Sequence, residues 1–260
     1  MRWPLFLLLL APAIQDPPQE SALARARAKF EEAQNAEKAG GDFDTPGKAA
    51  LAAFNEAVKA DAKSIEALAG RGEFRATLAA WRFPRGDFSK RAEFEAAIAD
   101  FDEAIKLDPR RADSYAGRGF ARSKLAVARM FARGDIDELF KTAFEDLDKA
   151  LELRPADAGL LILRGDAHYE KAVYARFRAD PHRPPAEKAL EDYREAVRLE
   201  SGRAALVDSR IASAGKLADS PVAVDDKGPS IVWSKTWELA KREAQVRRVP
   251  IFFYVSGGAG

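Results

Sequence analysis

The chain has 260 residues, of which 47% are hydrophobic and 32% are charged, with 42 basic and 41 acidic side chains. This composition is too apolar for a disordered chain and suits a folded domain or a repeat array. The near balance of charge gives no support to a nucleic-acid binder or a polybasic membrane binder, because both need a concentrated positive field. The sequence contains no cysteine, which excludes disulfides, thiolate metal sites and thiol catalysis from these residues.

Residues 1–13 have the pattern of a secretory signal peptide. Arg2 precedes an apolar run over residues 3–10, and Ala11-Pro-Ala13 places small residues at the positions that a signal peptidase reads. The alternatives are a membrane anchor or a buried helix, but the run is shorter than the roughly 20 residues that a bilayer span needs. We therefore expect export to a secreted or periplasmic location, with cleavage of the signal and a proline-rich linker over residues 14–20.

A repeat of 46 or 47 residues fills the region 21–218. Each copy has an alanine, an aromatic residue or leucine four positions later, and a second alanine three positions after that; the copies start at Ala50, Ala97, Ala143 and Ala189. Residues three and four apart share one face of a helix, so the alanines let a second helix approach while the large side chain fills the gap. Two helices per copy, neither able to bury its apolar stripe alone, predict an all-α stack of hairpins.

One copy, Ala97-x-x-x-Phe101-x-x-Ala104-Ile-Lys-Leu-Asp-Pro109, resembles the tetratricopeptide repeat (TPR) family. The resemblance implies a TPR-like helical-hairpin superhelix over residues 21–218, with four hairpins and a capping helix. The family repeats every 34 residues or so, whereas this chain inserts about 12 more at each hairpin tip. We therefore expect both helices of each hairpin to be longer than usual by roughly six residues.

The pattern predicts nine helices in this region, with Asp87 and Asp135 as N-caps of two of them. The expected ranges are 21–39, 46–60, 64–82, 88–107, 112–133, 135–153, 157–178, 185–199 and 203–218.

In each copy the residue directly before the packing glycine is arginine, and we call this set the arginine column. The family usually has an apolar residue at that position, so the column is a departure from it. The members of the column are Arg71, Arg118, Arg164 and, in the capping helix, Arg210. We interpret it as structural, with the guanidiniums paired to Asp100, Asp146 and Asp192, because an unpaired buried charge costs several kcal/mol. The alternative is a basic ladder that receives carboxylates of a partner peptide, as in some members of the family. The structural interpretation is favoured because the column lies beside the packing glycine rather than in an open groove.

The groove geometry of the family implies a concave, partner-binding surface. Its residues would be Arg27, Phe30, Glu73, Phe120, Lys124, Asp166, Tyr169 and Glu170. Aromatic side chains mixed with charges of both signs suit a protein or peptide partner better than a nucleic acid. The alternative for any one of them is an ordinary solvated helix face.

Residues 219–230 break the repeat and read as a linker, and the segment 231–260 changes period. Two short apolar runs flank a helical stretch that starts at Ser234, which predicts a short β-α-β segment. This segment is similar to the start of a thioredoxin-like domain but lacks the cysteine pair. It is a truncated domain, a degenerate one, or a local β-α-β unit on the last hairpin; the first two are favoured because so few strands are not stable alone.

The sequence shows no nucleophile–base pair and no phosphate loop, and His168 and His182 do not form a close metal-binding pair. We therefore expect no enzymatic activity, catalytic residue, cofactor or metal. The main hypothesis is an exported TPR-type scaffold that binds a protein or peptide through its concave face, with no nucleic acid and no membrane span after signal cleavage. The alternatives are an extracytoplasmic thioredoxin-like oxidoreductase, or its inactive relative, and a purely structural envelope component.

Overall fold

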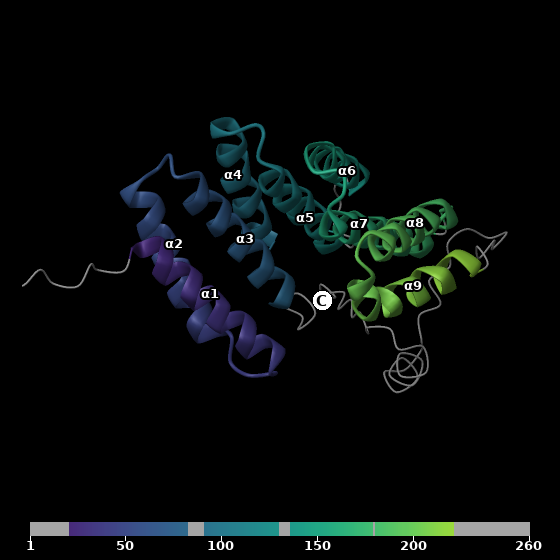
Figure 1. The fold of residues 1–260 in the computed structure, drawn as a ribbon, viewed down its shortest axis with the longest axis horizontal. Helices are drawn as coiled ribbons and strands as arrows, with labels where there is room; N and C mark the ends of the chain where they lie inside the picture. Colours follow the sequence, from purple (N-terminus) through teal and green to yellow (C-terminus); the bar gives the residue numbers. More distant parts are fainter. Residues whose placement is uncertain (1–20, 83–90, 130–135, 179, 221–260) are drawn as a thin grey trace, which may run out of the picture. The chain divides into compact units, whose positions relative to one another are not determined.

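The computed structural model describes residues 21–82, 91–129, 136–178 and 180–220. Within these ranges the chain forms nine α-helices, one 3-10 helix and no strand (Figure 1). The helices are α1 (Ala22–Lys38), α2 (Asp44–Ala60), α3 (Ile65–Arg82), α4 (Arg91–Leu107), α5 (Ala112–Ala128), α6 (Ile136–Leu153), α7 (Ala158–Phe177), α8 (Arg183–Leu199) and α9 (Ala204–Asp219), with the 3-10 helix η3 at Ser201–Arg203. The all-α, TPR-like array of hairpins that the repeat predicts is therefore confirmed.

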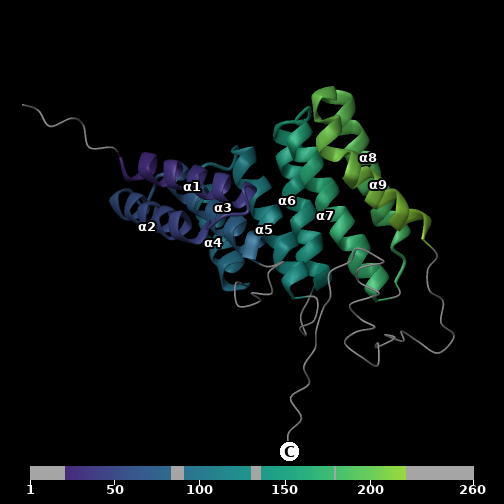
Figure 2. The ribbon, with the colours of Figure 1, turned by 90° about the horizontal axis from the view of Figure 1, so that it is seen from below.

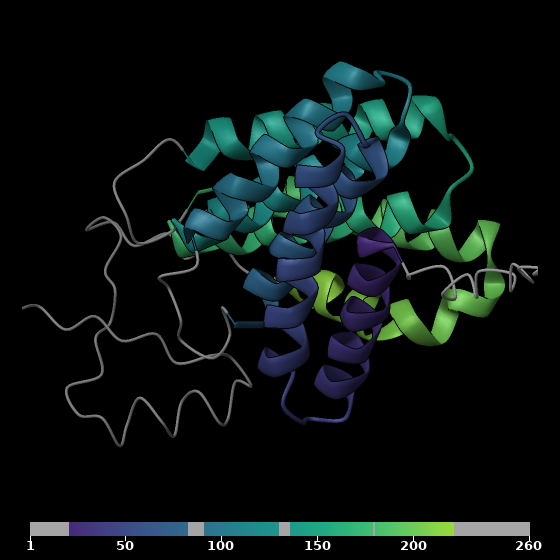
Figure 3. The same ribbon diagram turned by 90° about the vertical axis from the view of Figure 1, so that its left-hand side faces the viewer.

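The chain divides into two compact units, Met1–Ala62 and Lys63–Gly260. In the first unit, α1 and α2 form a hairpin (Figure 3). The connection between them includes Gly40, which has a positive φ of 69°. The core of the unit contains three phenylalanines, Phe30, Phe43 and Phe54, each at most 8% exposed. Aromatic rings are therefore among the buried residues of this unit.

The second unit stacks the hairpins α3–α4, α5–α6 and α7–α8, and α9 packs on α8 after the last of them (Figures 1 and 2). Helices α3 to α8 are 17 to 20 residues long, as the lengthened repeat predicts. Three boundaries within the described residues differ from the prediction by two or more residues. Helix α2 starts at Asp44 rather than at residue 46. Helix α5 ends at Ala128 rather than at residue 133, and α8 starts two residues early because Pro184 and Pro185 lie in its first turn, where no N–H is needed.

Several expectations fall on residues outside the described ranges. They are the signal peptide 1–13, the linker 14–20, the N-caps Asp87 and Asp135, most of the linker 219–230, and the β-α-β segment 231–260.

Close packing at one glycine per hairpin joins the two helices of each repeat. A Cβ atom on Gly119 of α5 would lie 2.8 Å from Leu147 Cγ and 3.0 Å from the backbone oxygen of Ala143, both on α6. A Cβ on Gly165 of α7 would lie 2.7 Å from the Tyr193 ring of α8. The alanine and large-residue positions of the repeat are therefore where the second helix meets the glycine of the first.

We expect Gly119→Ala to destabilise the protein by about 1–2 kcal/mol. Overpacking costs about 1–3 kcal/mol, and alanine returns at most about 1 kcal/mol through its helix propensity. The matched control is Gly215→Ala in α9, where a Cβ has no atom within 4 Å and only the propensity gain remains. Urea unfolding of both variants measures the two free energies; a Gly119→Ala protein as stable as the parent would contradict the packing argument.

Candidate functional site

Three buried aspartates pair with the arginine column inside the hairpins. Asp100, Asp146 and Asp192 are 4%, 3% and 4% exposed. Each accepts hydrogen bonds from Nε and Nη2 of one column arginine: Arg71, Arg118 and Arg164 donate from Nη2 over 2.6 Å in every case. The three salt bridges expected from the sequence are thus present, with the two-pronged geometry that a planar guanidinium favours.

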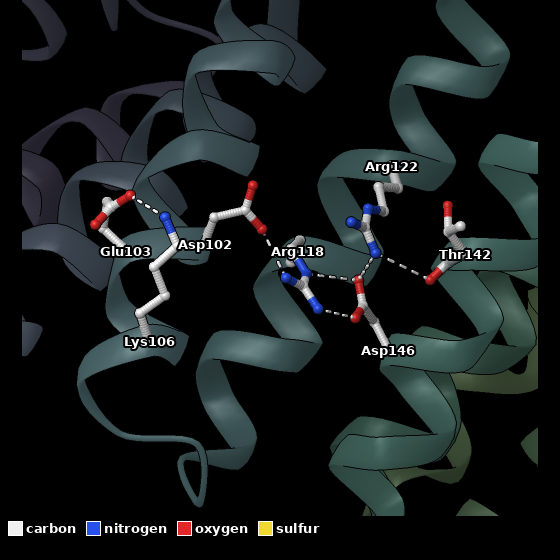
Figure 4. A network of polar contacts seen from close by, with 7 residues as sticks. All are labelled: Asp102, Glu103, Lys106, Arg118, Arg122, Thr142 and Asp146. Carbon is white, nitrogen blue, oxygen red and sulfur yellow. Dashed lines mark hydrogen bonds and ion pairs between the residues drawn. The ribbon is translucent and has the colours of Figure 1, made fainter.

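The column also reaches the preceding hairpin, which the sequence analysis did not predict. Arg118 Nη1 donates to Asp102 of α4 over 2.6 Å (Figure 4), and Arg164 Nη1 donates to Asp148 of α6 over 2.7 Å. One guanidinium on α5 therefore joins α4 to α6. Burial opposes the charge on Arg118, but the hydrogen bonds to Asp146 and Asp102 outweigh burial and raise the pKa of this arginine above its ordinary value.

A second arginine, four residues after the first, completes two of these clusters. Arg75 Nη1 lies 2.7 Å from Asp100, and Arg122 Nη1 lies 2.6 Å from Asp146 (Figure 4). The corresponding residue of the third hairpin is His168. The spacing of four residues in the first two copies was the signal that could have predicted this pairing, because such residues share a helix face.

His168 lies in an environment that disfavours its charged form. Its ring stacks on Phe144 with centroids 4.1 Å apart, and its Nδ1 is buried with no hydrogen-bond partner in the described ranges. Burial, together with the nearby charges of Lys188, Arg164 and Lys171, lowers the pKa of His168 to about 3. The imidazole is therefore neutral at physiological pH.

The residues predicted for the concave surface separate into two groups. In the first unit, Arg27 is exposed, but Phe30 is only 8% exposed and belongs to the hairpin core, so its assignment to a binding surface is corrected. It was misplaced because the repeat register does not distinguish the groove side of α1 from the side that packs on α2. In the second unit, Glu73 is exposed on α3, and Phe120 is partly buried on α5.

Four of the predicted residues lie together in one pocket of about 290 Å³, which we call the α7–α9 pocket. These are Lys124 of α5 and Asp166, Tyr169 and Glu170 of α7; the remaining lining comes from Tyr193, Ser209, Arg210 and Ser213. The repeat pattern places Arg210 in the arginine column and does not single out Tyr193, Ser209 or Ser213 as site residues. Tyr193 occupies the aromatic position of the repeat, which the pattern assigns to the core. Its hydroxyl is the feature that makes it part of the pocket lining, because the other copies have phenylalanine or leucine at this position.

Ion pairs and hydrogen bonds connect the walls of the α7–α9 pocket. Lys124 Nζ contacts Glu170 Oε1 and also lies 5.3 Å from the centre of the Phe120 ring. Asp166 Oδ1 accepts from the Tyr193 hydroxyl over 2.7 Å and from Arg210 Nε over 2.9 Å. Arg210 thus bonds across to α7. Burial raises the pKa of Tyr169, and burial and the Asp166 carboxylate raise the pKa of Tyr193, so both phenols stay protonated.

A second, wider hollow, the α6–α7 pocket, has a volume of about 550 Å³. It is lined by Asp137, Glu138, Lys141, Phe144, Glu145, Asp148 and Lys171. Two of its acidic residues bind arginines, Asp148 to Arg164 over 2.7 Å and Asp137 to Arg178 over 3.8 Å.

The described residues contain neither a cluster of metal-ligand side chains nor a helix suited to span a bilayer. No group of three or more histidine or acidic side chains there is placed to hold a metal ion. None of the helices in the same ranges combines the length and the hydropathy that crossing a bilayer demands.

No protein-family model matches the sequence, and no curated protein matches it. Similar solved structures include a thermophilic TPR protein of Thermus thermophilus, at 16% identity and a TM-score of 0.41, covering 73% of this chain and 98% of that one. A double mutant of MamA RS-1 has 18% identity and a TM-score of 0.40, covering 74% and 90%, and a MamA protein has 15% and 0.30, covering 70% and 94%. At these values the likeness carries no argument about function, and the fold assignment rests on the helices themselves.

We expect Asp146→Asn to destabilise the protein by about 3 kcal/mol, because it leaves Arg118 and Arg122 without a compensating buried charge. For a chain of this size the melting temperature should fall by about 6–12 °C. The control is Glu152→Gln, which breaks the exposed pair with Lys149 and should change stability by less than about 1 kcal/mol. An unchanged melting temperature for Asp146→Asn would sink the structural interpretation of the column.

We expect His168→Phe to reduce the loss of stability in acid. The folded pKa of His168, about 3, is below the unfolded value of 6.5, so the unfolded chain binds the extra proton as pH falls below 6.5. The parent should therefore lose up to about 1.4 kcal/mol per pH unit that the variant keeps. Urea unfolding at pH 7 and pH 5 measures this difference, and parallel pH curves for the two proteins would contradict the assignment.

Proposed function

We propose that the array is a non-catalytic interaction scaffold that binds a peptide or protein segment at the α7–α9 pocket. The observation that carries the proposal is the convergence of Lys124, Asp166, Tyr169 and Glu170 from two helices on one pocket, closed by α8 and α9. Half-buried aromatic residues beside charged groups of both signs are typical of surfaces that recognise other proteins.

The ion pairs in the pocket support recognition rather than chemistry. Lys124 and Arg210 are each held by a carboxylate, and the phenol of Tyr169 stays protonated. Groups fixed in this way pre-organise a surface, so a partner pays less ordering entropy on binding. The exposed rim would then select a partner by its pattern of hydrogen bonds.

We also propose that the scaffold works outside the cytoplasm, in the periplasm or as a secreted protein. The support is the signal-like pattern of residues 1–13. Mass determination of the protein recovered from a cell-envelope fraction would show whether residues 1–13 have been removed.

The double variant Phe120→Ala with Tyr169→Ala tests the binding proposal. We expect it to reduce partner affinity at least tenfold, about 1.4 kcal/mol, because buried aromatic anchors dominate interface energies. Partners captured from the cell envelope by the parent are identified, and their affinity for parent and variant is measured by calorimetry. The control is Leu107→Ala, which removes an apolar side chain that is 39% exposed on α4. Undiminished affinity of the double variant would show that the proposed surface is wrong.

A further inference from the structure

The charged groups of the α7–α9 pocket differ in how many of their hydrogen-bonding atoms have a partner. Its two cations are already engaged: Lys124 by Glu170 and the Phe120 ring, and Arg210 by Asp166 through Nε and by the Leu206 carbonyl through Nη1. Each cation is therefore neutralised by a carboxylate that it contacts. An anionic ligand would therefore meet two cations whose charge is already balanced inside the pocket.

The acceptor atoms of the same pocket are only half used. Asp166 accepts both of its hydrogen bonds at Oδ1, and within the described residues no donor reaches Oδ2. Glu170 meets Lys124 at Oε1, while its Oε2 is buried without a partner in that part of the chain. An unsatisfied buried acceptor destabilises the protein, and a donor supplied by a ligand would remove that cost. The unmet capacity is thus for hydrogen-bond donors.

An apolar stripe on α7 starts at the pocket. Tyr169, Val173 and Phe177 follow one another at intervals of four residues, so they lie on the helix face that also carries Asp166 and Glu170. Val173 is 38% exposed and Phe177 is 42% exposed, two of the four large hydrophobic residues with such exposure in the described ranges. The stripe is about 12 Å long at 1.5 Å per residue, which matches three or four residues of an extended peptide.

We propose that the α7–α9 pocket takes a lysine or arginine side chain of the partner, and that apolar residues next to it in the partner lie on the stripe of Tyr169, Val173 and Phe177. This inference rests on the proposed function and adds the chemistry of the partner. A cationic side chain brings only donors, three from lysine or five from arginine, to the two half-used carboxylates. The volume of about 290 Å³ suits one long side chain.

A peptide array on the full chain tests the inference. The probes are capped peptides whose central residue is lysine, arginine, norleucine or glutamate and whose flanks are randomised among alanine, leucine, valine and phenylalanine. We expect lysine and arginine to bind at least tenfold more tightly than norleucine. Asp166→Asn and Glu170→Gln should each reduce that preference several-fold, whereas Glu145→Gln, which removes a carboxylate from the α6–α7 pocket, should leave it unchanged.

Three outcomes would overturn the inference: equal binding of lysine and norleucine, a preference for glutamate, or no binding of any probe. The last two outcomes would reject the cationic subsite without rejecting the proposed binding surface. If the Phe120→Ala and Tyr169→Ala variant loses its natural partner while the array shows no basic preference, the binding surface stands and only the cationic subsite is wrong. Thermal melts of Asp166→Asn and Glu170→Gln confirm that any lost preference is not a loss of folding.

Discussion

The pairing of arginines with one buried aspartate per hairpin is the interaction on which the second unit depends. Asp146 is 3% exposed and receives Arg118 and Arg122 from α5, while Arg118 also reaches Asp102 on α4. Breaking such a cluster is costly because each remaining charge stays partly buried. Since the guanidinium is rigid and planar, the cluster also fixes how α4, α5 and α6 are aligned. Stacking of successive hairpins is therefore tied to packing within each hairpin.

The third hairpin departs from this pattern of two arginines on one buried aspartate. The candidate site lies in the same hairpin. His168 takes the place of the second arginine, so within the described residues Asp192 has Arg164 as its one arginine partner. Tyr193 takes the place of Phe101 and Leu147, and its hydroxyl reaches Asp166. Substitutions that would be neutral for a repeat thus bring polar groups to the surface next to α9. The shared pattern explains the fold, whereas its departures create the pocket.

The repeat pattern predicted the helices and the arginine–aspartate pairs inside each hairpin, because these depend on spacings of three and four residues along one helix and on a fixed register between two. It did not predict Asp102 and Asp148, since contacts between successive hairpins depend on how one hairpin is rotated against the next. Phe30 was misplaced for a related reason: the register identifies an apolar helix face but not which neighbour covers it. The sequence could not assign Ser209 and Ser213 to the pocket, because that assignment depends on where α9 packs.

Docking of α9 decides whether the pocket exists. Arg210 holds this helix to Asp166 of α7, and at the other end the Ser220 hydroxyl accepts from Arg176 over 2.7 Å and lies 3.0 Å from His182 Nε2. Since α9 supplies Ser209, Arg210 and Ser213, its detachment would open one wall of the pocket and free Arg210. A ligand that needs the closed wall must stabilise the docked helix by mass action. Ligand binding in this pocket and the packing of α9 on the array are therefore thermodynamically coupled. Arg210 takes part in both, because it lines the pocket and bonds α9 to Asp166.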